Sequence, residues 1–122
     1  MMKTGVIFLL DNDKTFLSLY GTLLKDKGCQ VFATDNLFLL MKYAKTAEPK
    51  WIFIDENFAK IHETEILKLI NNHLPLTRTR YAIMSKIKAR KNKKIFPNIE
   101  FVYKPKVMEK MLQISEKSCN LP

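Results

Sequence analysis

The sequence has few of the residues that mark several common classes of protein. Its two cysteines, Cys29 and Cys119, and its two histidines, His62 and His73, form no metal-binding or redox motif. No apolar run reaches the roughly 18 residues that a membrane span requires, and the run near the amino terminus has no small-residue cleavage site. We therefore expect two free thiols and a cytoplasmic protein with no membrane partner.

Linkers and repeats are absent as well. With only three glycines there is no Gly/Ser-rich stretch, and no segment is repeated or of low complexity. The 47% of apolar residues is enough for a core and excludes a disordered chain. A length of 122 residues supports one domain over residues 1–122, in which residues 116–122 are a tail or the start of a linker.

What the sequence does contain is a regular alternation of apolar runs and helical patterns. The apolar runs predict strands at residues 6–10, 30–34, 51–54, 81–84 and 100–103. The helical patterns predict helices at residues 14–27, from Asp35 or Asn36 to before Pro49, and at residues 63–72, 86–94 and 107–116. This alternation predicts an α/β domain with a doubly wound, five-stranded parallel sheet and helices on both faces.

Polar residues stand where four of the predicted strands end. Asp11 and Asn12 follow the first strand, Asp55 the third, Ser85 the fourth and Lys104 the fifth. In open parallel sheets, ligands bind beyond the carboxyl ends of the strands. We therefore expect these five side chains to meet in one cleft.

The expected cleft combines carboxylates, an amide, a hydroxyl and an ammonium group. Two neighbouring carboxylates repel each other unless a cation neutralises them, and their hard oxygen atoms suit Mg²⁺. A hydroxyl and a lysine beside a metal-bound carboxylate can hold a phosphoryl group. Asp55 would then be a nucleophile that forms an acyl phosphate.

Four segments at the strand ends resemble those of a known family: FLLDND at 8–13, WIFIDEN at 51–57, AIMS at 82–85 and FVYKP at 101–105. The chain resembles the receiver domain of bacterial two-component response regulators, and the spacing from Asp55 to Ser85 is typical of that family. The resemblance implies the flavodoxin-like strand order 2-1-3-4-5. It also implies a signalling protein rather than an enzyme with a separate substrate.

The resemblance implies a phosphoacceptor and a metal site. Asp55 would take a phosphoryl group from the phosphohistidine of a histidine kinase or a phosphotransfer protein. The metal ligands would be Asp11, Asn12, Asp55 and the backbone carbonyl of Asn57.

The resemblance also implies a switch. Ser85 and Lys104 would each bind a phosphoryl oxygen. Ser85 would move together with Phe101, which stands three residues before the lysine. Phosphorylation would thereby change a partner-binding face.

Four residues depart from the family pattern. Asn12 stands where the family has a second acid, so Mg²⁺ should bind more weakly, unless Asn12 only forms hydrogen bonds within its loop. Ala59 and Glu63 replace a usual proline and glycine. Lys86 replaces a small residue, and it either crowds the site or binds the phosphate. These departures favour an alternative function, a degenerate receiver that binds partners without phosphorylation.

The net charge of +9 is concentrated in one window. Residues 78–94 contain no acid and eight basic residues, namely Arg78, Arg80, Lys86, Lys88, Arg90, Lys91, Lys93 and Lys94. This window is a solvated face, a nucleic-acid site, or the part of region 86–114 that binds an acidic protein or a second copy through Lys86, Lys88, Arg90 and Lys91. Direct nucleic-acid binding is the least favoured, because no recognition helix or stacking aromatic platform accompanies the cluster.

Overall fold

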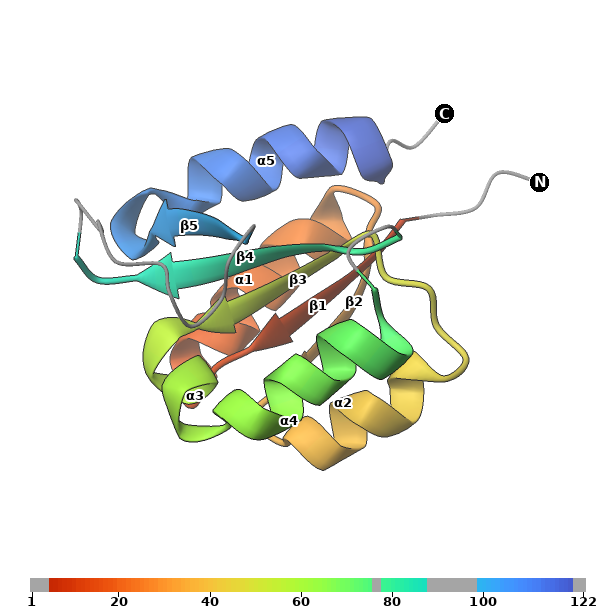
Figure 1. Ribbon diagram of the computed structural model, residues 1–122. Coiled ribbons are helices and arrows are strands. Elements are labelled where there is room, and N and C mark those ends of the chain that lie inside the picture. The colour runs from red at the N-terminus through yellow and green to blue at the C-terminus, as the bar shows by residue number, and fades with distance from the viewer. Residues whose placement is uncertain (1–4, 76–77, 88–98, 120–122) are drawn as a thin grey trace.

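The computed structural model describes residues 5–75, 78–87 and 99–119. Five strands form one sheet in the order β2-β1-β3-β4-β5, and every neighbouring pair is parallel (Figure 1). The strands are β1 Val6–Leu10, β2 Gln30–Thr34, β3 Trp51–Asp55, β4 Arg80–Ser85 and β5 Glu100–Tyr103. The predicted fold class and strand order are confirmed. The central strands β1, β3 and β4 are almost fully buried, whereas the edge strands β2 and β5 are partly exposed.

Helices cover both faces (Figure 1). Helices α1 (Lys14–Asp26) and α5 (Val107–Ser118) pack on one face. The other face carries α2 (Leu37–Ala44), α3 (Glu56–Ile61) and α4 (Glu63–Lys68), which continues as a short π-helix, η1 (Leu69–His73). Successive side chains of a strand point to opposite faces, so β1 contributes Ile7 and Leu9 to one core and Phe8 and Leu10 to the other. Within the described residues, no helix is long and apolar enough to span a membrane.

Single residues determine where two of the helices begin and where the first one ends. The Asp13 side chain caps α1 by accepting from the Phe16 amide at 3.1 Å. Of the two candidates for the second helix, Asn36 is the cap, and it accepts from the Leu39 amide at 3.1 Å. Gly28 follows α1 with a φ of 92°, the left-handed conformation that glycine adopts most easily.

One helix of the structure was not predicted, and one predicted helix is only partly described. Helix α3 was not predicted, and it begins directly after β3, at Glu56. Asp55 caps this helix, which explains why a segment with a weak apolar pattern is helical. The predicted helix at residues 86–94 falls mostly outside the described residues.

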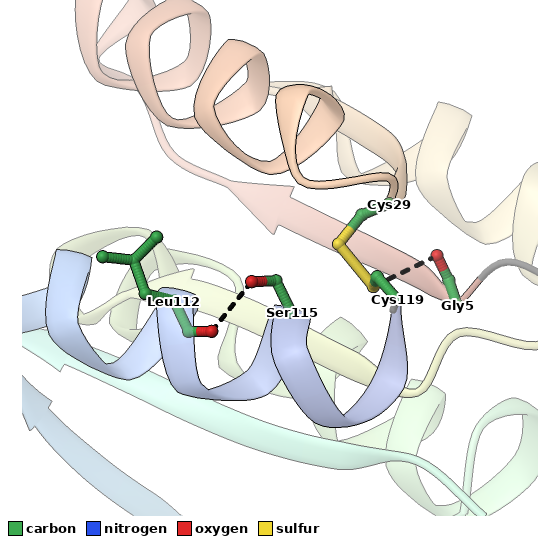
Figure 2. Close-up of a disulfide and its surroundings, with 5 residues drawn as sticks. All are labelled: Gly5, Cys29, Leu112, Ser115 and Cys119. Atoms are coloured by element: carbon green, nitrogen blue, oxygen red, sulfur yellow. Dashed lines mark hydrogen bonds between the residues drawn. A yellow bond between two sulfur atoms is a disulfide. The ribbon is translucent and has the colours of Figure 1, made fainter. Parts of the chain in front are cut away.

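The expectation of two free thiols is wrong. Cys29, in the turn between α1 and β2, forms a disulfide with Cys119, which follows α5, and their Cα atoms are 4.8 Å apart (Figure 2). Both residues are buried, and the Cys119 sulfur lies 3.5 Å from the Gly5 carbonyl oxygen. The sequence gives no local sign of the pair, because 90 positions separate them and only packing of α5 beside α1 brings them together.

Candidate functional site

A buried ion triad lies at the carboxyl edge of the sheet. Lys104, directly after β5, donates from Nζ to Asp11 Oδ2 at 2.7 Å and to Asp55 Oδ1 at 3.0 Å. Asp11 directly follows β1, and Asp55 is the last residue of β3. The three side chains come from strands that are far apart in the sequence, and the parallel sheet places the ends of these strands at one edge.

Water has little access to this triad. The side chains of Lys104, Asp11 and Asp55 are 13%, 3% and 10% exposed. Burial by itself lowers the pKa of Lys104, but the hydrogen bonds and negative charges of Asp11 and Asp55 outweigh it and raise the pKa above its usual value. Lys104 therefore carries a fixed positive charge at neutral pH. Its ammonium also lies 4.7 Å from the centre of the Phe16 ring.

The second oxygen of each carboxylate accepts from a backbone amide. Asp11 Oδ1 accepts from the Asp13 amide at 2.9 Å, and Asp55 Oδ2 accepts from the Phe58 amide at 3.3 Å. The latter bond is the cap of α3, so Asp55 lies at the positive end of that helix. Both carboxylates are thus oriented from two sides, by Lys104 and by the backbone.

The hydroxyl at the end of β4 lies in a separate small network. Ser85 Oγ donates to Glu56 Oε1 at 3.1 Å and accepts from the Ile87 amide at 3.1 Å. Ser85 is 1% exposed, and Glu56 is half-buried. Because Glu56 directly follows Asp55 in the chain, the two networks adjoin.

The donor set suits a hard cation with few protein ligands. Asp11 and Asp55 share one cation already, in the form of Lys104. Among the described residues, no cluster of three or more histidine, cysteine, aspartate or glutamate side chains could hold a metal ion. Two carboxylates with water fit Mg²⁺, which commonly keeps several waters, but they do not fit a metal that needs a full set of protein ligands.

The sequence matches no protein-family model and has no significant match among curated proteins. The structure, in contrast, is similar to solved response regulators. Chemotaxis response regulator CheY4 of Vibrio cholerae matches with a TM-score of 0.74 at 13% identity, over 93% of this chain and 99% of that chain. A response regulator from Thermotoga maritima matches with a TM-score of 0.69 at 14% identity, over 93% and 99%. NtrX from Brucella abortus matches with a TM-score of 0.69 at 13% identity, over 96% of this chain but 26% of that one.

This chain has the receiver fold. Of the residues predicted for the receiver site, the structure brings three into direct contact: Asp11, Asp55 and Lys104. Ser85 lies at the same edge but is bonded to Glu56.

The two other predicted metal ligands, Asn12 and Asn57, lie outside the ion triad. Asn12 is exposed. Asn57 is exposed and lies in the first turn of α3. Helical carbonyls point towards the carboxyl end of their helix, so the Asn57 carbonyl faces away from Asp55 in this arrangement.

The predicted switch and partner residues are only partly described. Phe101 is half-buried in β5 and packs against the core beneath α2, α3 and α4. Lys86 is exposed just after β4. Lys88, Arg90 and Lys91 lie outside the described residues, so the structure does not describe the rest of the predicted partner face.

Sequence reasoning missed two residues of the site. Asp13 caps α1, so the carboxylate of Asp11 is not needed as a helix cap and instead accepts from Lys104. The signal was present, because Asp13 is the acid immediately before the predicted helix. Glu56 gave no such signal, since its contact with Ser85 depends on α3 starting directly after Asp55.

Proposed function

We propose that this protein is a two-component receiver that accepts a phosphoryl group on Asp55. The observation that carries the proposal is the buried triad of Asp11, Asp55 and Lys104 at the carboxyl edge of a receiver fold. A carboxylate held beside a fixed cation and a second carboxylate suits the formation of an acyl phosphate.

In the proposed reaction, an Asp55 oxygen attacks the phosphorus atom of a phosphohistidine. The new O–P bond forms as the P–N bond breaks, and the leaving imidazole takes up a proton from water. Lys104 would neutralise one oxygen of the transferring group, and Ser85 would donate to another. A Mg²⁺ ion held by Asp11 and Asp55, with the Asn12 oxygen as a further ligand, would supply the remaining positive charge.

The proposal includes a set of partners. The donor would be a histidine kinase or a phosphotransfer protein, and Asp55 would be the only group modified, so the protein is not an enzyme with a separate substrate. An acidic protein or a second copy of the chain would bind through region 86–114. A cytoplasmic location is part of this proposal, but free thiols no longer support it, because the cysteines are paired.

A second candidate function is that of a receiver that binds partners without phosphorylation. The observation that favours it is that both networks are complete without a phosphoryl group. Lys104 is bonded to both carboxylates, and Glu56 accepts from Ser85. Direct nucleic-acid binding stays a third and weaker prediction, and five of the eight basic residues of its window lie outside the described residues.

Incubation with radiolabelled acetyl phosphate and MgCl₂ tests the main proposal. We expect label that hydroxylamine releases, that requires Mg²⁺ and that is absent from Asp55→Asn. Asp35→Asn is a matched control, because Asp35 is exposed and follows β2 at the same edge of the sheet. Label that persists in Asp55→Asn would refute the assignment, and no label in any variant would favour the second function.

A further inference from the structure

The hydrogen bond between Ser85 and Glu56 is not part of the mechanism proposed above. Ser85 lies at the end of β4, where the mechanism needs its hydroxyl for a phosphoryl oxygen. In the structure that hydroxyl donates to Glu56 Oε1 at 3.1 Å, while its oxygen accepts from the Ile87 amide at 3.1 Å. Both hydrogen-bonding functions of Ser85 are therefore in use.

A serine hydroxyl has one proton to donate. Ser85 can give it to the Glu56 carboxylate or to a phosphoryl oxygen, but not to both at once. The two acceptors are alike in kind, since each is an anionic oxygen that forms a charge-assisted hydrogen bond. Ser85 is almost completely buried, so water is a poor substitute for either of them.

Electrostatic repulsion between Glu56 and a phosphoryl group adds to their competition for the Ser85 proton. Glu56 is the residue after Asp55, and its carboxylate is held towards the end of β4 by Ser85. A phosphoryl group on Asp55 would replace the single negative charge of the carboxylate by about two negative charges in this half-buried region. Like charges at this range repel, so the carboxylate has to leave Ser85 before the phosphoryl group can use it.

We infer that Glu56 is a positioning residue that occupies the Ser85 hydroxyl in place of a phosphoryl oxygen and so opposes phosphoryl binding at Asp55. The inference rests on the proposed function, because it assigns an internal competitor to the proposed phosphoryl site. Before phosphorylation, the Ser85 hydroxyl at the end of β4 would therefore be bonded to a carboxylate oxygen of Glu56. Phosphorylation would replace that oxygen by a phosphoryl oxygen.

Beryllium fluoride with MgCl₂, a stable analogue of a bound phosphoryl group, provides the test. We would measure its dissociation constant by calorimetry and its bound form by ¹⁹F NMR for the wild type, Glu56→Ala and Glu56→Gln. We expect Glu56→Ala to bind the analogue about tenfold more tightly, from the loss of one charge-assisted competitor. The affinity of Glu56→Gln should rise less, because glutamine keeps an acceptor oxygen. This variant replaces Glu56→Ala in the test if Glu56→Ala folds poorly.

The matched control is Glu109→Gln. Glu109 is exposed and, like Glu56, lies in the first turn of a helix, so it reports the effect of removing one negative charge alone. Its affinity should equal that of the wild type within about twofold.

A double-mutant cycle with Ser85→Ala separates positioning from a general structural effect. In the Ser85→Ala background the gain from Glu56→Ala should fall to about twofold, because only the charge contribution is left. A gain of the same size in both backgrounds would overturn the role of the Ser85 hydroxyl.

The two proposals fail in different ways. Equal affinities for the wild type and Glu56→Ala, or weaker binding by Glu56→Ala, would overturn the inference and leave Asp55 as a phosphoryl acceptor. No Asp55-dependent binding by any variant would overturn the proposed function, and the inference with it.

Discussion

Lys104 Nζ and Asp55 Oδ1 are 3.0 Å apart in a buried ion pair, and the same ammonium is 2.7 Å from Asp11 Oδ2. One cation therefore holds two carboxylates that would otherwise repel each other. Any group that arrives at Asp55 meets a lysine that is already bonded. The function of this edge of the sheet depends on how readily that lysine exchanges its partners.

The first prediction concerns Lys104→Met. Removal of the ammonium leaves two buried carboxylates side by side, so the free energy of unfolding at pH 7 should fall by about 3 kcal/mol. Urea unfolding followed by circular dichroism measures the change. MgCl₂ should restore part of the loss, because a divalent cation can take the place of the lysine charge.

Lys110→Met is the matched control for this experiment. Lys110 pairs with Glu100 at 2.8 Å, but the two side chains are 27% and 43% exposed. Exposed pairs contribute at most about 1 kcal/mol, so this variant should lose much less stability than Lys104→Met. Equal losses in the two variants would show that the triad is no stronger than a surface ion pair.

The second prediction is that stability falls in alkali. The pKa of Lys104 is raised by its carboxylate partners despite burial, and burial raises the pKa of Tyr81. Both groups keep their protons in the folded state after the unfolded chain has lost them. Their contributions are complete below the unfolded values, near pH 10, and are lost as the pH rises from there through the folded values.

Tyr81→Phe isolates one of these two contributions. The Tyr81 hydroxyl donates to the Leu74 carbonyl at 2.7 Å, so its removal should lower stability at pH 7 by about 1–2 kcal/mol. The decline of stability between pH 9 and 11 should be shallower than in the wild type. An unchanged alkaline slope would show that Tyr81 does not titrate abnormally.

The third prediction concerns the disulfide. A link between residues 90 positions apart removes much of the freedom of the unfolded chain, which the chain-entropy model values at roughly 4–5 kcal/mol. Treatment with a thiol reductant should lower the midpoint of thermal unfolding of the wild type. Cys29→Ala should be destabilised to a similar extent, and reductant should have no further effect on it. A wild-type midpoint that does not respond to reductant would argue against the bond.

The fourth prediction compares two glycines. A Cβ at Gly5 would overlap the backbone carbonyl of Ser118 at the end of α5, so Gly5→Ala should cost about 1–3 kcal/mol. At Gly21, inside α1, the nearest atom to an added Cβ is 3.8 Å away, which is an ordinary contact. Gly21→Ala should therefore stabilise the protein by about 0.5–1 kcal/mol, because alanine favours the helix. Thermal unfolding of the two variants would show shifts of opposite sign.

Much of the fold could be predicted from local pattern. The strands β1, β2 and β5 begin and end at the predicted residues, because apolar runs alternate with helical patterns along the chain and mark these limits. The start of α3 could not be predicted in this way. It depends on the Asp55 side chain turning back to the Phe58 amide, and a pattern of apolar residues does not show that bond.

The sequence by itself determined which residues stand at the carboxyl ends of the strands, and therefore that Asp11, Asp55, Ser85 and Lys104 share one edge of the sheet. Only the tertiary structure decided how they pair. Lys104 joins the two aspartates and Ser85 turns to Glu56, because hydrogen-bond partners are set by distance and direction in space. The disulfide between Cys29 and Cys119 has the same origin, since residues 90 positions apart become neighbours only when the helices pack.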